Sequence, residues 1–78
     1  MKITLKLFAN LREYLPHCEG NKCQLELFEN TSLEDMLVKL NIPMDLPKII
    51  FVNGVHKDFN YILKENDEVS VFPPIAGG

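Results

Sequence analysis

The residues best suited to chemistry stand at the end of the chain, which finishes V-F-P-P-I-A-G-G. Gly77 and Gly78 have no Cβ, so a narrow tunnel in another protein can admit them. Pro73 and Pro74 are expected to end a strand and project the chain into solvent, because proline fixes φ and lacks an N–H. The group so presented is an α-carboxylate, which needs activation, for instance as a mixed anhydride with AMP. Residues 73–78 are therefore predicted to form a flexible C-terminal tail that an adenylating enzyme takes as substrate.

No other stretch has the pattern of a catalytic site. The sequence contains no P-loop, no G-x-G-x-x-G, no paired-histidine metal motif and no nucleophile elbow. His17, Cys18 and Cys23 form the one cluster with possible metal chemistry, but C-x4-C is not a usual zinc spacing and no second ligand pair exists. We interpret the two cysteines as free thiols in a surface loop, with a reversible disulfide as the alternative. The chain is expected to bind no metal or cofactor and to be no catalyst alone.

Composition limits the class of protein and its partners. Seventy-eight residues are enough for one domain, predicted over 1–78. The net charge of −3 argues against nucleic acid or an anionic membrane as the main partner. The N-terminus, M-K-I-T-L-K-L-F, lacks the unbroken apolar stretch of a signal peptide. Two cysteines are too few for a disulfide scaffold, so the sequence favours a cytoplasmic protein.

Alternation of apolar and polar residues predicts most of the strands. Residues 2–8 have period 2, and Q-L-E-L-F-E alternates again. I-I-F-V-N-G-V-H-K is typical of a hairpin, because Asn53 and Gly54 both suit the positive φ of a type I′ turn. V-S-V-F gives the last strand, with Val69 and Val71 facing inward.

Two helical segments separate these strands. In T-S-L-E-D-M-L-V-K-L, Thr31 and Glu34 have the spacing of a capping box, and an apolar stripe follows. Asn41 and Pro43 should end this helix. A-N-L-R-E-Y-L suits one or two further turns, ended by Pro16. The order β-α-β-α-β-β-β predicts an α+β roll of ubiquitin-like architecture, which by itself assigns no function.

Two aromatic rings fall on the solvent side of the predicted sheet. Phe8 lies opposite the inward residues of the first strand, and Phe72 opposite those of the last. If these strands are parallel neighbours, both rings lie at the end of the sheet where the tail leaves. We interpret them as a partner surface, the alternative being that each ring is covered by its own chain. The acidic run around Glu65, Asp67 and Glu68 is interpreted as a solvated turn, or alternatively as a docking surface for a basic partner.

The two ends of the chain together resemble a known family. K-L-F-A-N-L-R-E near the start and N-D-E-V-S-V-F-P-P-I-A-G-G at the end resemble the small subunits of molybdopterin synthase, which are ubiquitin-like sulfur carriers related to the thiamine-biosynthesis carrier. The resemblance covers essentially the whole chain. It implies a β-grasp roll with one mixed sheet of about five strands and a main helix on one face. Asn66 stands where the family usually has glycine, but asparagine also tolerates a left-handed turn.

The resemblance also implies a reaction cycle. A ubiquitin-activating-like adenylyltransferase would use ATP to adenylate the carboxylate of Gly78, and a sulfur donor would convert it to a thiocarboxylate. The tail would then enter the large synthase subunit, in a heterotetramer, and deliver sulfur to cyclic pyranopterin monophosphate. Gly77 would be the tunnel-compatible neighbour. The implied docking residues are Phe8, Phe72, Pro73, Pro74, Ile75 and Ala76, with His56 a weaker candidate.

Three alternatives stay open from the sequence. Arg12, the matching arginine, is either a surface contact or half of a structural salt bridge. The chain could instead carry sulfur for thiamine or another thio-metabolite. It could also be a protein modifier whose terminal glycine forms an isopeptide bond with lysine.

Overall fold

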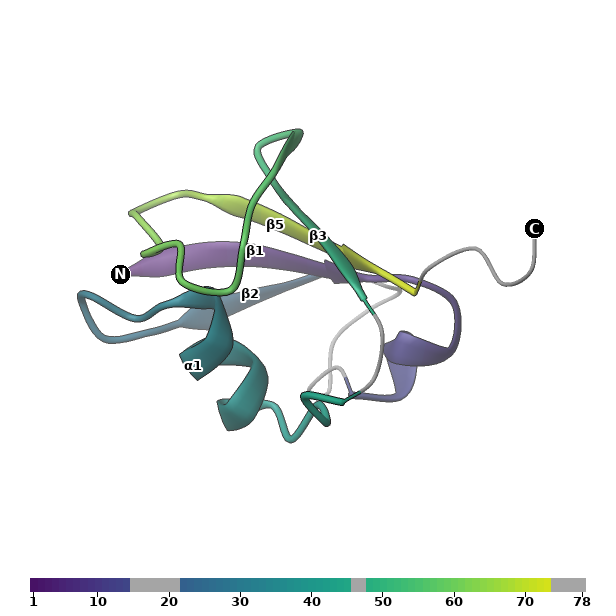
Figure 1. The fold of residues 1–78 in the computed structure, drawn as a ribbon. Coiled ribbons are helices and arrows are strands. Elements are labelled where there is room, and N and C mark those ends of the chain that lie inside the picture. Colours follow the sequence, from purple (N-terminus) through teal and green to yellow (C-terminus); the bar gives the residue numbers. More distant parts are fainter. Residues whose placement is uncertain (15–21, 46–47, 74–78) are drawn as a thin grey trace.

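The computed structural model describes residues 1–14, 22–45 and 48–73. In chain order the elements are strand β1 (Lys2–Leu7), 3-10 helix η1 (Ala9–Tyr14), β2 (Lys22–Glu26), helix α1 (Leu33–Lys39), β3 (Ile49–Val52), β4 (Val55–His56) and β5 (Glu68–Phe72). The strands form one sheet in the order β2-β1-β5-β3-β4, and α1 lies on one of its faces (Figure 1). The predicted element order is confirmed, with a 3-10 helix as the first helical segment.

The sheet is mixed because its two central strands are parallel. β1 pairs with β5 in the register Leu5↔Val69 and Leu7↔Val71, whereas the remaining neighbours are antiparallel. The parallel pair was the condition on which the joint placement of Phe8 and Phe72 depended. That condition is confirmed.

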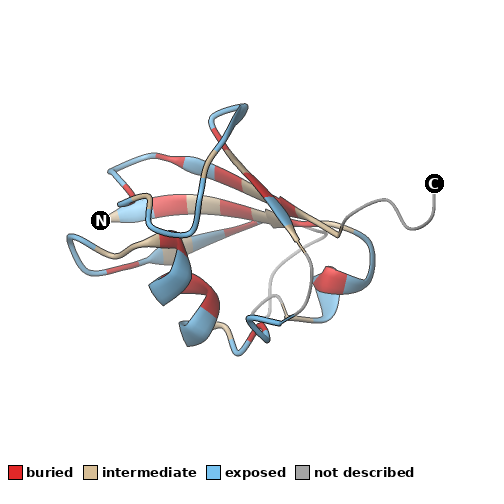
Figure 2. Cartoon of the chain, viewed as in Figure 1, coloured by how far each residue is buried: buried red, intermediate tan, exposed pale blue. Residues whose placement is uncertain are grey.

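The core lies between the sheet and α1. β1, β3 and β5 bury alternate residues, seen as red bands in Figure 2, and α1 contributes one apolar stripe. The buried hydrophobic cluster consists of Ile3, Leu5, Leu7, Leu11, Leu27, Leu33, Met36, Leu37, Ile42, Ile50, Val52, Leu63, Val69 and Val71. The strand residues in this cluster all lie on the inner face of the sheet. The side chains on its outer face are therefore not part of the core.

The capping box of α1 lies one residue later than predicted. Ser32 is the N-cap: its Oγ accepts the Asp35 N–H at 3.0 Å, and its own N–H donates to Asp35 Oδ2 at 3.4 Å. Thr31 instead donates its hydroxyl to the Phe28 carbonyl at 2.7 Å. The sequence offers two frames with the same i, i+3 spacing, T-x-x-E and S-x-x-D, and spacing alone does not separate them.

Asparagine supplies most of the left-handed turns. Asn53 has φ 53° and Gly54 φ 83°, which confirms the predicted hairpin turn between β3 and β4. Asn41, at φ 63°, follows the end of α1. Asn66 has φ 69° and donates its N–H to the Lys2 carbonyl at 2.7 Å. Asparagine therefore adopts the left-handed conformation at the position where the resembled family has glycine.

The acidic run before β5 is not a solvated turn throughout. Asp67 is only 5% exposed, and its carboxylate accepts hydrogen bonds from Asn53 Nδ2, Tyr61 Oη and the Lys64 N–H, each at 2.9 Å. Burial, followed by the hydrogen bond to Asp67 and the charge of that carboxylate, raises the pKa of Tyr61 above its ordinary value. Both interpretations of the run are therefore wrong for Asp67, which is a structural acceptor.

In the described ranges, no helix has the length and apolar content that crossing a membrane requires.

Candidate docking face beside the C-terminal strand

Phe8 and Phe72 stack on the outer face of the sheet. Phe8 directly follows β1 and Phe72 ends β5, so the parallel register places the two side chains together. Their ring centroids are 4.3 Å apart and the planes differ by 8°. The Phe8 N–H donates to the Val71 carbonyl at 3.2 Å, which extends the ladder up to the ring. The prediction that both rings lie at one end of the sheet is confirmed.

Two further rings extend this stack across the sheet. Phe51, from β3, meets Phe72 edge to face at 5.8 Å between centroids, and His56 meets Phe51 at 5.9 Å in the same way. The register Phe51↔His56 brings the last pair together across the β3–β4 hairpin. We call Phe8, Phe51, His56 and Phe72 the aromatic face. Sequence reasoning missed Phe51, although alternation in I-I-F-V places it opposite the buried Ile50.

The rings of the aromatic face cover one another only in part. The three phenylalanines are half-buried, and His56 is exposed. Edge-to-face and stacked contacts stabilise such pairs by about 0.5–1.5 kcal/mol each, so the rings help to hold one another in position. The chain itself therefore covers part of each phenylalanine ring, chiefly through the other rings of the aromatic face, and the remaining part is exposed. Apolar surface gathered on the solvent side of a sheet is typical of a protein-binding site.

Phe8 and Phe72 lie at the end of the sheet where β5 finishes, and Phe51 pairs with Ser70 in the middle of that strand. Toward the start of β5 the outer face becomes polar, with Lys6 Nζ 3.3 Å from Glu68 Oε1. Arg12 is exposed on η1, and it makes no ion pair with any residue in the described ranges. The salt-bridge interpretation of Arg12 therefore finds no partner there.

The predicted tail begins directly at the aromatic face. Pro73 follows Phe72, is half-buried and is the last described residue. Pro74, Ile75, Ala76, Gly77 and Gly78 lie outside the described residues, so their assigned roles stay predictions.

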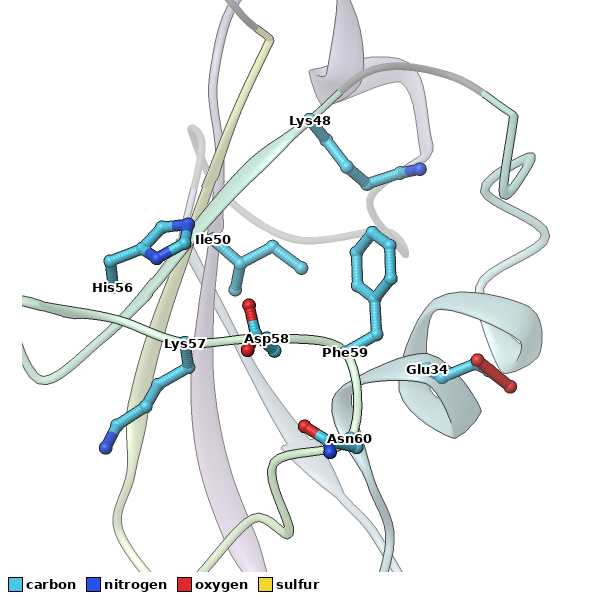
Figure 3. Close-up of a pocket in the computed structure, with 8 residues that line it drawn as sticks. All are labelled: Glu34, Lys48, Ile50, His56, Lys57, Asp58, Phe59 and Asn60. Carbon is cyan, nitrogen blue, oxygen red and sulfur yellow. The ribbon is translucent and has the colours of Figure 1, made fainter.

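A hollow of about 480 Å³ lies between the β3–β4 edge of the sheet, the segment that follows β4 and the start of α1 (Figure 3). Its lining consists of Glu34, Lys48, Ile50, His56, Lys57, Asp58, Phe59 and Asn60. The Ile50 side chain points toward the Phe59 ring, and Lys48 Nζ lies 5.5 Å from the centroid of that ring. Burial lowers the pKa of Lys48, against the charge of Asp45, which raises it. His56 therefore lies both on the aromatic face and at the rim of this hollow.

The prediction of free thiols at Cys18 and Cys23 needs correction at one of the two positions. Cys23 lies buried in β2 and is disulfide-bonded, so the free-thiol interpretation is wrong for this residue. His17 and Cys18 lie outside the described residues. Within the described ranges, no three His, Cys, Asp or Glu side chains gather as they would around a metal ion.

The mixed five-strand sheet with α1 packed on one face defines a ubiquitin-like β-grasp protein. The model of the ThiS family matches residues 5–78, and the chain belongs to that family. No curated protein matches the chain.

Solved structures agree with this assignment. The chain is 25% identical to a protein of Pyrococcus furiosus described as subunit 1 of molybdopterin converting factor, with a TM-score of 0.74 over 95% of this chain and 98% of that one. It resembles in fold one chain from the structure of the complex of subunits 1 and 2 of molybdopterin-converting factor from Helicobacter pylori, at 20% identity and TM-score 0.65, covering all of this chain and all of that one. It equally resembles in fold SAMP1 of Haloferax volcanii, at 18% identity, TM-score 0.75 and full coverage of both chains.

Proposed function

We propose that this protein is the sulfur carrier of molybdopterin synthesis. The observation that carries the proposal is the aromatic face, which ends at the residue where the P-P-x-x-G-G segment begins. A sulfur carrier needs a docking surface and a reactive group a set number of residues from it along the chain. Here the tail that ends in Gly78 directly follows Phe72 of the aromatic face. Membership of the ThiS family supports the class of carrier.

Docking on the large synthase subunit would use the aromatic face. Phe8 and Phe72 offer a flat, pre-stacked apolar surface, so little side-chain entropy is lost when a partner covers it. His56 at the margin adds a polar group that can donate or accept a hydrogen bond. Arg12, exposed on η1 directly after Phe8, would contact the partner at the rim, where a charge affects the association rate more than the affinity. In this proposal two small subunits bind a pair of large subunits.

The tail would carry the chemistry. The adenylyltransferase transfers AMP from ATP to the Gly78 carboxylate and releases pyrophosphate, which gives an acyl-adenylate. A sulfur donor at the oxidation level of sulfide then displaces AMP and leaves a thiocarboxylate. Pro73 and Pro74 direct the tail away from the sheet, Ile75 and Ala76 contact the tunnel wall, and Gly77 leaves the tunnel unobstructed. When sulfur is delivered to cyclic pyranopterin monophosphate, water cleaves the bond between the acyl carbon and sulfur, and the carboxylate of Gly78 is restored. We place the whole cycle in the cytoplasm.

Two other uses of the same tail are distinguishable. A carrier for thiamine or another thio-metabolite would be charged in the same way but would bind no large synthase subunit. A protein modifier would form an isopeptide bond between Gly78 and a lysine, and the fold likeness to SAMP1, whose name denotes a small archaeal modifier protein, keeps this use in view.

Co-purification from cells of the source organism tests the proposal. We expect the tagged chain to retain a large synthase subunit, and the Phe72→Asp variant to lose it while remaining folded. A matched control is Gln24→Asp, which adds the same charge to an exposed position on β2. Recovery of the chain attached to lysines of many proteins, with no large subunit, would favour the modifier. Recovery of neither, with a thiocarboxylate present, would favour the other carriers.

A further inference from the structure

Phe28 lies at the end of the sheet opposite the aromatic face. β1 and β2 are antiparallel with Lys2 opposite Glu26, so the chain after β2 lies where β1 begins and not where Phe8 follows it. Phe28 is 84% exposed, the most exposed of the large hydrophobic side chains in the described ranges. Its carbonyl accepts the Thr31 hydroxyl at 2.7 Å, so the turn before α1 is tied in place. A ring fixed in water beside a folded core is apolar surface without a partner.

A hollow of about 310 Å³ lies directly beside this ring. Its lining consists of Met1, Glu26, Leu27, Phe28 and Lys39, which together we call the far-end patch. The floor is fixed, because Leu27 donates its N–H to the Met1 carbonyl at 2.8 Å and accepts from the Met1 amino group at 2.7 Å. Since an apolar cavity of about 150 Å³ can hold benzene, the hollow has room for one phenyl ring.

The charges of the far-end patch are of both signs. Lys39 Nζ lies 6.0 Å from the centroid of the Phe28 ring, and Glu26, which also lines the hollow, is exposed and has its carboxylate 3.7 Å from the Met1 amino group. A partner surface with a single sign of charge would place a like charge opposite either Lys39 or Glu26. A second copy of the same patch, related by a two-fold rotation, would place its Glu26 opposite Lys39 and its Lys39 opposite Glu26.

We propose that the far-end patch binds a second copy of this chain as a two-fold dimer. In a two-fold interface the same residues meet from both sides. Each Phe28 ring would enter the hollow of the other copy, and each Lys39 would lie against the partner copy's Glu26 and ring. The patch is small, so the dimer is transient. Because the patch is at the other end of the sheet, the dimer leaves both aromatic faces open.

Concentration series of the full chain test the dimer. In heteronuclear NMR spectra recorded from about 50 μM to about 2 mM, the amide signals of Leu27, Phe28 and Lys39 should shift with concentration, as expected for a Kd near 1 mM. The Phe28→Ser variant should weaken self-association at least tenfold. Val55→Ser is the matched control, since Val55 is 54% exposed on β4, at the opposite edge of the sheet. It should behave as the unmodified chain.

A charge exchange tests the orientation. Lys39→Glu and Glu26→Lys should each self-associate more weakly than the unmodified chain, because like charges would face each other. An equal mixture of the two variants should associate more strongly than either alone, since every facing pair is then opposite in sign.

Three results would overturn the proposal: signals that do not move with concentration, self-association that survives Phe28→Ser, or a mixture no stronger than its components. A chain that stays monomeric but binds the large synthase subunit less tightly after Phe28→Ser would assign the patch to that subunit and also overturn the dimer. Failure of the dimer leaves the sulfur-carrier proposal standing, since that proposal depends on the aromatic face and the tail.

Discussion

The two ends of β5 are built on different physical principles. Before its first residue, Asp67 collects three hydrogen bonds from within the chain, and Asn53 Oδ1 accepts the Glu68 N–H at 2.9 Å. At its last residue, Phe72 is held by two ring contacts and still meets water on its outer side. At the first end, the buried carboxylate is paired within the chain. The second end keeps part of its apolar surface exposed, where a partner could contact it.

The comparison separates residues that stabilise the fold from residues that are proposed to bind a partner. Removing a buried acceptor leaves several donors without partners, which costs stability. Removing a half-exposed ring costs the fold less, because part of the ring was never taken from water. Substitutions at the two ends of one strand should therefore have opposite effects on stability and on binding.

The largest expected effect is on binding. Phe72→Asp places a charge in the middle of the aromatic face, and we expect its Kd for the large synthase subunit to rise about 1,000-fold, or about 4 kcal/mol. The thermal midpoint should change far less, and adenylation of the tail should be less affected than subunit binding. Isothermal titration calorimetry measures the affinity, with Gln24→Asp as control. Equal losses in Phe72→Asp and Gln24→Asp would contradict a binding role for this end of β5.

The next effect is on stability. Asp67→Ala removes the acceptor of Asn53, Tyr61 and Lys64, and we expect the free energy of unfolding to fall by about 2–3 kcal/mol in urea denaturation. Glu65→Ala, in the same turn but exposed, should cost less than about 1 kcal/mol. The folded fraction of Asp67→Ala should bind the large subunit normally. A selective loss of binding there would remove the distinction between the two ends.

The smallest expected effect is on the pH dependence of stability, through Tyr61 at the polar end of β5. Burial first, and then its contact with Asp67, raise the pKa of Tyr61 above 10.0. The folded state therefore holds the phenolic proton more tightly than the unfolded state does. The resulting stability is complete below pH 10 and is lost as the pH rises through the folded-state pKa.

Denaturation series between about pH 8 and about pH 11 check this prediction. The free energy of unfolding should decline more steeply in the unmodified chain than in Tyr61→Phe, which has no phenol to ionise. Parallel declines would show that other groups account for the alkaline loss.

The sequence predicted what depends on the alternation of residues along a strand. Period 2 and the parallel pairing together placed Phe8 and Phe72 side by side, because a strand's faces follow directly from its numbering. The Asn-Gly pair predicted its turn for an equally local reason.

Features that depend on distant pairings were not predictable. Phe51 joins the aromatic face only because β3 lies beside β5, and Asp67 is buried only because Asn53 and Tyr61 come close in the fold. The capping frame of α1 was missed because two overlapping sequence patterns fit it equally. The roles of Gly77 and Gly78 depend on chemistry supplied by other proteins.

The central claim is that the Gly78 carboxylate is converted to a thiocarboxylate. Mass spectrometry of the C-terminal peptide, prepared from protein isolated from cells, tests this claim most directly. The account predicts a fraction of the peptide with one oxygen of the Gly78 carboxylate replaced by sulfur. A variant extended by one residue beyond Gly78 should show no such exchange and should melt at the same temperature as the unmodified chain. An unmodified carboxylate in every sample, or full biological activity of the extended variant, would contradict the account.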